Sequence, residues 1–578
     1  MLLLLLFIVV PAIGSSTEAR EAHVAWEMYE NHELVLPLRN GLVPSKPPLF
    51  HWTAAAVAEL FGNSNAFTTR LVSLLAGSLL LVVTVLSASL LLSSTVPAPK
   101  ANPLRAGLLA GAALSLSPGF VRLSGDARVD MLFSLFASSA IMIFLHACAS
   151  YISGRSSFDH AFNSGKITAF FLLCALATLA KGPLGLVLPI ICAFSMLGYS
   201  AGWRRSLRFF VRPRIGWLIF VLVAVPWYVL AALKGEGAFV NRQLVFENLL
   251  RFFGGENVNT EPPWFYLTTV FSDLFPWSLM ALALFIRSAK LSRARNESVS
   301  GLQNRLPYRA RNLPLVCALT GLIFFSLSSG KRHTYLLPLF PFLAIYFAWA
   351  ADEYWITSSK QFKLGLGRNV RRLAVGCAVL LTVMLFAIQY TRLPLPVAAP
   401  SVQQAIQFVA AWRPVLELWL ALILLVLALM ALRGAAAAVQ LWFLYLALVV
   451  FFFSVGLGIK NDLKGFDRAA EQIRSRMGGA PLSAVRLARE EYLDPLLFYL
   501  KHPVNLIEPR AGLERCSGYY VLQPHHMGVL SAAGKVNIAA RFRQIHDEEK
   551  GRTDRDILLV QCYSSGSPGE GSPLRERM

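Results

Sequence analysis

Residues Thr17 to Trp52 read TEAREAHVAWEMYENHELVLPLRNGLVPSKPPLFHW, a polar and acid-rich segment between two long apolar runs. The segment opens with Glu18, Arg20 and Glu21, and it ends in Lys46 and two prolines just before the chain becomes apolar again. Lysine binds phosphate well as a point charge. A carboxylate near the start and a lysine near the end of one membrane-surface loop therefore indicate a site for an anionic, phosphate-bearing substrate.

The rest of the chain has the composition of an α-helical membrane protein. Its 578 residues are 55% hydrophobic and only 15% charged, with a mean hydropathy of +0.53, whereas typical domains contain about 25% charged residues. Many apolar runs reach the roughly 20 residues that a spanning helix needs, and a β-barrel would show short alternating segments instead. The net charge of +21 comes largely from arginines in short loops between apolar runs, where topology rules place them, so nucleic-acid binding is not expected.

About thirteen membrane spans are predicted, counting the apolar run at 1–14 as the first. The other spans are expected at 67–94, 105–120, 128–149, 167–181, 184–200, 215–233, 264–287, 313–329, 334–351, 372–390, 412–432 and 437–457. The predicted transmembrane domain is therefore 1–457, and residues 458–578 are predicted to form a second domain.

Three arginine-rich loops predict the orientation, because basic loops stay on the cytoplasmic side. They lie at 202–214, 287–312 and 352–372. Alternation of the spans then places five other loops and the C-terminal region outside. Those outer loops are 15–66, 119–127, 181–183, 234–263 and 329–334.

The C-terminal region, 458–578, has a soluble composition, and β-like runs alternate there with helical stretches, which predicts a small α/β domain. The β-like runs are 482–487, 504–507, 519–522 and 557–561, and the helical stretches are 465–477 and 490–501. The last dozen residues are rich in Gly, Ser, Pro and charge, so they are expected to be disordered. Cys516 and Cys562 could pair if this region is extracytoplasmic, a question that the sequence leaves open.

The predicted topology brings the ionisable residues near the membrane to one side. Charged groups at or inside the bilayer are energetically expensive, which makes them candidates for function. The residues at the outer edge are Glu18, Lys46, Asp126, Asp130, Lys181 and Lys331. Their convergence is the strongest argument within the sequence for a site.

Lys46 and Asp130 are the leading candidates. Because proline disfavours helix in the residue before it, Lys46 is expected to be held extended and ready to bind phosphate. The alternative is an anchor at the membrane surface. Asp130, at the mouth of a span, could act as general base for a hydroxyl or orient an acceptor, or it could only pair with Arg128 or Arg122.

The remaining candidates carry weaker signals. Glu18 could serve as the base, ligate a divalent ion, or pair within its own helix. Lys181 and Lys331 each lie at the tip of a hairpin, where they could hold a phosphate or only anchor the turn, and Asp126 could be an ordinary solvated loop residue. No Gly-rich phosphate loop, HExxH motif or Ser–His–Asp order is present in the sequence, which disfavours an ATP-driven transporter.

Four motifs, taken in order, resemble one enzyme family. They are E-A-R-E-A…W-E-M…L-P…N-G…K-P-P-L…W, then A-R-V-D-M-L-F, then L-A-K-G-P-L-G-L-V-L-P, then S-S-G-K-R-H-T-Y-L-L-P-L-F-P, and they span roughly 15–350. The pattern resembles the bacterial branch of the GT-C glycosyltransferases, and is similar to lipid A aminoarabinose transferases and protein O-mannosyltransferases. This resemblance implies thirteen membrane helices, a periplasmic active site and a polyprenyl-phosphate sugar donor.

The resemblance also implies roles for individual residues. Lys46 matches the family lysine that contacts the donor phosphate, and Asp130 matches an acid near the site. Glu18 falls at or one place beside the first-loop acid, where the family pattern is Asp-Glu and this chain has Thr17-Glu18. Glu18 and Asp130 are therefore the predicted catalytic acids.

This chain departs from the family pattern at two positions, where it has Ser45 instead of Glu and Asn248 near the place of a His. The resemblance therefore leaves open whether the site uses a divalent metal. Ser45 and Asn248 occupy positions that are associated with metal binding in the lipid A transferases. Lys331 and Arg251 are predicted to add positive charge on the donor phosphate. Further candidates to line the site are Arg20, Asp126, Lys181, Asn248 and Tyr335.

The predicted function is that of a glycosyltransferase in the bacterial inner membrane. It would move a sugar from a polyprenyl-phosphate donor to lipid A, another glycan or a protein, at the periplasmic face. The expected partners are this donor, a glycolipid or protein acceptor, and the bilayer. The alternative is a transporter or flippase of a lipid-linked sugar, but a transporter would carry ionisable groups or broken helices near mid-bilayer, whereas these charges lie at one edge.

Overall fold

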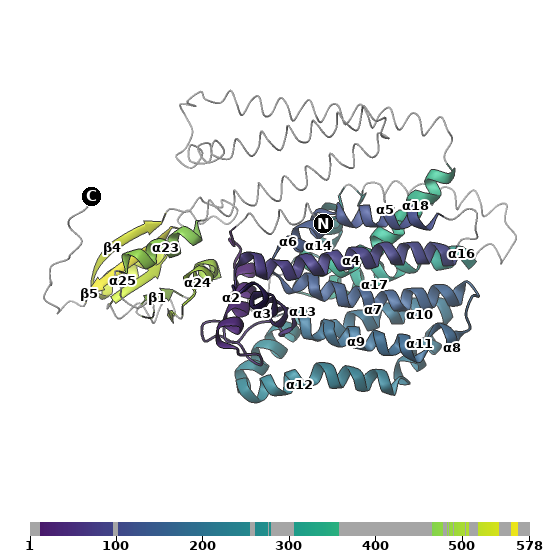
Figure 1. The fold of residues 1–578 in the computed structure, drawn as a ribbon, viewed down its shortest axis with the longest axis horizontal. Helices are drawn as coiled ribbons and strands as arrows, with labels where there is room; N and C mark the ends of the chain where they lie inside the picture. Colours follow the sequence, from purple (N-terminus) through teal and green to yellow (C-terminus); the bar gives the residue numbers. More distant parts are fainter. Residues whose placement is uncertain are drawn as a thin grey trace, which may run out of the picture.

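The structure is a computed structural model in which a helical bundle adjoins a small β-sheet region at one end (Figure 1). It describes residues 12–95, 102–254, 261–275, 277–278, 306–357, 465–477, 483, 485–488, 491–502, 504–507, 518–542 and 556–563.

The bundle is built from long apolar helices joined by short turns. Its elements are α2 (Ser16–Asn31), α3 (Leu49–Phe61), α4 (Ala66–Thr95), α5 (Pro103–Ser115), α6 (Pro118–Gly125), α7 (Val129–Ile152), α8 (Phe158–Ala161), α9 (Ser164–Lys181), α10 (Leu184–Ala201), α11 (Trp203–Val211), α12 (Arg214–Phe239), η1 (Val240–Leu250), α13 (Arg251–Phe253), α14 (Phe265–Asp273), α16 (Leu306–Arg311), α17 (Leu313–Leu327), η3 (His333–Leu339) and α18 (Phe340–Thr357).

Within the described residues, seven helices are long and apolar enough to cross a membrane, or eight if the bent pair α5–α6 forms one span. The expected polytopic α-helical membrane fold is therefore confirmed. The predicted spans at 372–390, 412–432 and 437–457 lie outside the described residues, as do most of the span at 1–14 and the second part of the span at 264–287.

Two predicted boundaries in the bundle are wrong. The span expected at 105–120 is broken, because Pro118 begins the new helix α6 and the axes of α5 and α6 meet at 67°. A proline cannot continue the hydrogen-bonding ladder of a helix. The outer loop expected at 234–263 is mostly helical, since α12, η1 and α13 continue to Phe253.

Protein covers much of helix α2. Ala19 and Ala22 are fully buried and pack with Phe498 of the C-terminal region. Helix α3 packs against α2 on another side. In Figure 1, α2 and α3 lie between the bundle and the sheet region.

The C-terminal region contains a five-stranded mixed sheet of order β2-β1-β3-β5-β4. Its elements are α23 (Phe466–Arg476), β1 (Val485–Ala488), η6 (Glu491–Leu493), α24 (Asp494–Leu500), β2 (Asn505–Ile507), β3 (Gly518–Leu522), η7 (Pro524–His526), α25 (Met527–Ala533), β4 (Lys535–Phe542) and β5 (Ile557–Tyr563). The small α/β region is thus confirmed as a mixed sheet. The sequence prediction missed the edge strand β4, whose residues are mostly exposed or half-buried and so lack a strong apolar signal. The predicted disordered tail lies outside the described residues.

Candidate active site

A partly open pocket with about 350 Å³ of empty space lies where the ends of several bundle helices meet. Helix α2, the start of α7, the end of α9 and the start of η3 all contribute to its wall. The lining residues are Thr17, Glu21, Lys46, Arg128, Val129, Asp130, Lys181, Arg332, Thr334 and Tyr335. Four cationic side chains face two carboxylates in this set, so the pocket suits an anion.

Asp130 joins two of the cations. It lies in the first turn of α7 and is only 4% exposed. The Lys181 ammonium donates to its Oδ1 at 2.5 Å, and Arg128 Nε donates to its Oδ2 at 3.1 Å. The structure therefore brings together Asp130 and Lys181, which the sequence predicted as separate candidates. Both carboxylate oxygens of Asp130 accept a hydrogen bond from a cation.

The turn between α9 and α10 sets the position of Lys181. Gly182 adopts a φ of 88°, a conformation that favours glycine. A Cβ atom at Gly185 would lie only 2.2 Å from the backbone nitrogen of Thr178, so α9 and α10 can approach closely only because this position has no side chain. The Lys181 ammonium also lies over the ring of Tyr335, 4.9 Å from its centroid, an attractive cation–π geometry.

Lys46 enters the pocket from the segment that joins α2 to α3. Its ammonium donates to Glu247 Oε2 at 2.6 Å, and the Glu247 side chain is 3% exposed. Gln243, on the same element η1, donates to the carbonyl of Pro44 at 2.8 Å. Glu247 therefore fixes the Lys46 side chain, and Gln243 fixes the backbone two residues before it. Both residues belong to the region that was predicted to be an outer loop.

Glu21 is a pocket carboxylate that the sequence prediction did not single out as catalytic. His51 of α3 lies against it, with Nε2 2.8 Å from Glu21 Oε2. Burial alone would raise the pKa of Glu21, but the His51 hydrogen bond and the charges of His51, Lys46 and Arg20 lower it overall. The Glu21 carboxylate is therefore ionised at neutral pH.

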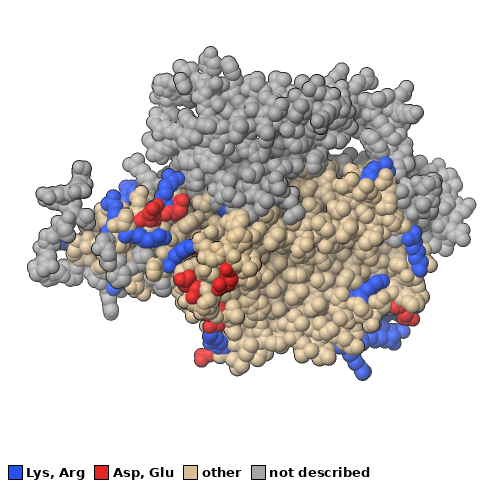
Figure 2. All heavy atoms as spheres, viewed as in Figure 1, with Lys and Arg blue, Asp and Glu red and all other residues tan. Residues whose placement is uncertain are grey.

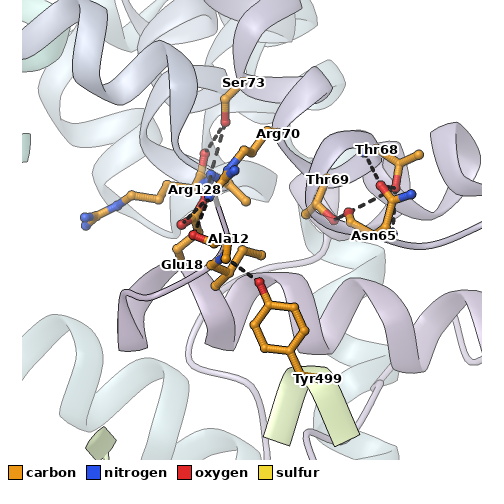
Figure 3. Close-up of polar contacts among 11 residues, drawn as sticks. Ala12, Glu18, Asn65, Thr68, Thr69, Arg70, Ser73, Arg128 and Tyr499 are labelled. Atoms are coloured by element: carbon orange, nitrogen blue, oxygen red, sulfur yellow. Dashed lines mark hydrogen bonds and ion pairs between the residues drawn. The ribbon is translucent and has the colours of Figure 1, made fainter. Parts of the chain in front are cut away.

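Glu18 lies outside the pocket and instead makes a buried ion pair. Arg70 Nε donates to its Oε1 at 2.6 Å and Arg70 Nη2 to its Oε2 at 3.1 Å, and the Ala127 amide donates to Oε1 at 3.0 Å. Figure 3 shows Glu18 and Arg70 together beside the backbone of Arg128. Glu18 thus ties α2 to α4 and to the residues before α7. Its predicted catalytic role gains no support from this position.

Asp126 lies near this ion pair and does not line the pocket. Burial raises its pKa to about 6, and the negative charge of Glu18 adds to the rise, while Arg128, Arg70 and Arg122 oppose it. Its environment is that of a desolvated acid rather than of a solvated loop residue.

Other predicted site residues are also placed away from the pocket. Lys331 is 7% exposed and donates to the carbonyls of Glu261 and Ser328 at 3.0 and 2.8 Å. Arg20 pairs with Asp494 of the C-terminal region at 3.0 Å. Asn248 lies in η1 and Arg251 begins α13, but their side chains lie outside the described part of the chain.

The metal expectation gains no support from the described residues, which contain no group of three or more His, Cys, Asp or Glu side chains that could hold an ion. Glu21 and His51 adjoin each other, but a pair of donors is fewer than a protein metal site uses.

The pocket also contains polar residues that the prediction did not select, namely Thr17, Glu21, Arg128, Arg332 and Thr334. The two arginines could have been found from their positions, because Arg128 and Arg332 directly precede α7 and η3, two elements that line the pocket. No signal distinguished Glu21 from Glu18, since both are acids three positions apart in the same polar segment.

Known proteins resemble this chain over most of its length, although no protein-family model matches it. The undecaprenyl phosphate-alpha-4-amino-4-deoxy-L-arabinose arabinosyl transferase of Shewanella sediminis is 27% identical over 472 residues, which are 80% of this chain and 76% of the relative. A protein of the same name from Pseudomonas fluorescens, numbered 1, is 28% identical over 328 residues, 56% of this chain and 51% of the relative. In that case the matched part is about half the length of the relative.

A solved structure shares the fold. The crystal structure of ArnT from Cupriavidus metallidurans bound to undecaprenyl phosphate matches with a TM-score of 0.67 at 20% identity, and the match covers 98% of both chains. The predicted resemblance to the GT-C glycosyltransferases is confirmed. The comparisons favour a glycosyltransferase over a transporter, and they agree with a multi-pass protein of the inner membrane.

Proposed function

We propose that this chain, which has the GT-C fold, transfers a sugar from a polyprenyl-phosphate donor to an acceptor of the cell envelope. The observation that carries the proposal is the pocket itself. Lys46, Lys181, Arg128 and Arg332 gather there around two carboxylates at one end of an apolar bundle. Such a site can hold an anionic head group while its lipid tail lies along the helices.

Lys46 is the proposed ligand of the donor phosphate. Glu247 binds its ammonium at the pocket wall, and the prolines at 47 and 48 stiffen the backbone after it, so a phosphate would meet a fixed positive charge. Fixed charge that faces a developing anion lowers the barrier without reorganisation. Lys181 and Arg128 add positive charge from another side of the pocket, and Asp130 orients them.

The proposed reaction is displacement at the anomeric carbon. The acceptor oxygen forms a new bond to that carbon, and the bond from the carbon to the phosphate oxygen breaks. The polyprenyl phosphate leaves with the electron pair, and its charge is neutralised by the pocket cations. Because the leaving group is already an anion of a strong acid, the site needs a base for the acceptor hydroxyl more than it needs a general acid.

We place the pocket and the C-terminal region on the periplasmic side. Exposed basic residues gather at the opposite end of the bundle, as expected for a cytoplasmic end. They include Arg204, Arg205, Arg208, Arg212 and Arg309. Cys562 is disulfide-bonded, and its partner lies outside the described residues. A disulfide fits an oxidising compartment.

The first donor to test is the one named in the relatives, undecaprenyl phosphate linked to 4-amino-4-deoxy-L-arabinose, with lipid A as acceptor. The protein in liposomes should release undecaprenyl phosphate and modify the acceptor. Comparison of envelope glycolipids and glycoproteins by mass spectrometry, with and without the gene, identifies the sugar and the acceptor if this pair fails.

Replacing Lys46 tests the proposed phosphate site. Lys46→Ala should lower the release of undecaprenyl phosphate by about 10²–10³-fold and weaken binding of undecaprenyl phosphate itself. Lys234→Ala is the matched control, because Lys234 is a half-exposed lysine that pairs with Glu33 outside the pocket. Undiminished turnover by a folded Lys46→Ala protein would refute the assignment.

A further inference from the structure

We propose that Glu21, held in place by His51, takes the proton from the acceptor hydroxyl. This inference rests on the proposed function and names a catalytic residue for it. It follows from the different partners of the carboxylates around the pocket.

The helical phase of α2 decides which of its acids faces the pocket. Thr17 and Glu21 lie four positions apart, and residues at this spacing share one face of a helix. Both line the pocket. Glu18 turns away to Arg70, so Glu21 is the acid that α2 presents to a substrate.

The other acids near the pocket are held by cations. Asp130 has one oxygen on Lys181 and the other on Arg128. Glu247 lies against Lys46 and Arg242, at 2.6 and 3.6 Å. Asp130 thus has no oxygen left for an acceptor, and Glu247 does not line the pocket, so neither acid is placed to accept a proton from the acceptor.

Glu21 differs because its hydrogen-bond partner is a histidine. Among the described residues, its Oε1 makes no hydrogen bond, whereas its Oε2 contacts His51 Nε2. Glu21 is 7% exposed at the pocket wall. One oxygen is thus oriented by His51, and the other remains for the acceptor.

His51 is placed to orient the carboxylate rather than to touch the substrate. It is 1% exposed and does not line the pocket. Its Nδ1 is buried without a hydrogen-bond partner among the described residues, so the contact with Glu21 is its one polar anchor there. We therefore assign His51 as a positioning residue.

The charges around Glu21 keep it ionised, the form that a general base must have before it reacts. His51 on α3, Lys46 in the preceding segment and Arg20 on α2 lower its pKa against the effect of burial. Arg39 and Arg128 also interact with it electrostatically. Asp130, Lys181 and Arg332 complete the charged lining of the same pocket.

The proton then has a defined path. As the acceptor oxygen bonds to the anomeric carbon, its proton passes to Glu21 Oε1, and the polyprenyl phosphate departs with the electrons of the broken bond. The protonated Glu21 returns its proton to water after the product leaves. Atoms and charge balance without a further reactant.

The test compares the wild-type chain in liposomes with Glu21→Gln, which keeps the shape of the side chain but cannot accept the proton. We expect kcat to fall about 10²–10⁴-fold, while binding of undecaprenyl phosphate stays within about threefold of wild type, unlike that of Lys46→Ala. Glu30→Gln is the matched control, because Glu30 is an exposed acid on the same helix, and it should keep full activity.

Variants of His51 separate positioning from mere support of the fold. His51→Gln retains a donor for Glu21 and His51→Leu does not, so the Leu variant should lose more kcat than the Gln variant. Because His51 lowers the pKa of Glu21, the acid limb of the kcat/KM profile should move to higher pH in His51→Leu.

The outcomes distinguish the two proposals. An active wild type with a Glu21→Gln variant that keeps its kcat within about threefold would overturn the role of Glu21 and leave the proposed function standing. A wild type that releases no undecaprenyl phosphate from any envelope donor would overturn both.

Discussion

Glu18 and Glu21 lie three positions apart on one helix and meet opposite surroundings. Glu18 is locked to Arg70 inside the protein, whereas Glu21 faces the pocket beside His51. The sequence identified the acidic segment but could not assign these two roles. Which side of a helix faces a pocket depends on the residues that pack against its other sides. For α2 these include Phe498, which lies almost 500 residues further along the chain.

Residues whose position depends on a local turn were more predictable. Lys46, Asp130, Lys181 and Tyr335 all line the pocket, and each lies next to a proline, a helix start or a tight turn that is visible in the sequence. Lys331 carried a similar signal, yet its ammonium is bound by backbone carbonyls. A hairpin-tip lysine can thus cap its own turn, and the sequence does not distinguish that use from phosphate binding.

Asp126 provides a prediction about stability and pH. Its pKa is raised from 3.8 to about 6, first by burial and then by Glu18. The folded state therefore binds this proton more tightly than the unfolded chain does, so stability falls as pH rises from about 4 through 6 and is level above that. Asp126→Asn cannot ionise and should unfold at a higher temperature than wild type at pH 7.5.

Thermal unfolding in detergent at several pH values measures this difference. The two midpoints should converge as pH is lowered toward 4, where Asp126 is protonated in the wild type as well. A two-unit shift corresponds to at most about 3 kcal/mol. A variant that is less stable than wild type at pH 7.5 would show that the ionised carboxylate makes a favourable contact.

At the level of elements, α2 couples the pocket to the C-terminal region. One face of α2 carries Glu21, and α24 packs against another. Asp494 of α24 binds Arg20 at 3.0 Å and Arg39 at 2.7 Å. Asn40 exchanges two hydrogen bonds with the backbone of Val504. These contacts fix both the helix and the start of the segment that leads to Lys46.

This coupling predicts an effect of Asp494 on activity. Asp494→Asn removes the negative charge between Arg20 and Arg39, so α2 and the Lys46 segment should lose part of their restraint. We expect turnover to fall about tenfold, chiefly in kcat, since precise placement of reacting groups contributes strongly to rate. The measurement is sugar transfer in liposomes.

Asp556→Asn is the control for that experiment, because it breaks an ion pair with Arg541 inside the sheet region and leaves the contact with α2 intact. If both variants lose activity equally, the effect is one of general stability. Activity of Asp494→Asn equal to wild type would show that α2 is positioned by the bundle alone.

Element types were easier to predict than their boundaries. The long apolar runs gave helices because apolar length and composition decide membrane spans. The break before α6 was missed although Pro118 marks it in the sequence. The helical continuation beyond α12 was missed because it depends on packing between helices. Strand β4 was missed because it lies at a sheet edge and needs no apolar pattern on its exposed side.

For the whole molecule, charge separates the two ends of the bundle. Helix α7 begins at the pocket with Asp130, and α9 ends there with Lys181. The other ends of these helices adjoin Arg155 and Lys166, near the arginines of α11. Figure 2 shows a broad uncharged surface between an end near the sheet region, which carries both acids and basic side chains, and a far end where basic side chains predominate.

The amphipathic helix α11 marks that far end. Its exposed apolar residues Trp203, Leu207 and Val211 recur every fourth position, and Arg204, Arg208 and Arg212 follow them on the adjacent stripe. An apolar stripe beside an arginine stripe fits a helix that lies at the membrane surface. The proposed orientation has the basic end in the cytoplasm and therefore the pocket on the periplasmic side, where a lipid-linked sugar would be presented.

Labelling of single cysteines tests this orientation directly. In a variant without other reactive thiols, Glu30→Cys at the pocket end should react with a membrane-impermeant maleimide in intact spheroplasts. Arg208→Cys on α11 should react only after permeabilisation, because both positions are exposed but at opposite ends of the bundle. The reverse pattern would place the pocket in the cytoplasm, where the arginine stripe would face the wrong leaflet and a periplasmic acceptor would be out of reach. Reaction of both positions from outside would instead show that α4, α7 and α9 do not cross the membrane, contrary to their length and composition.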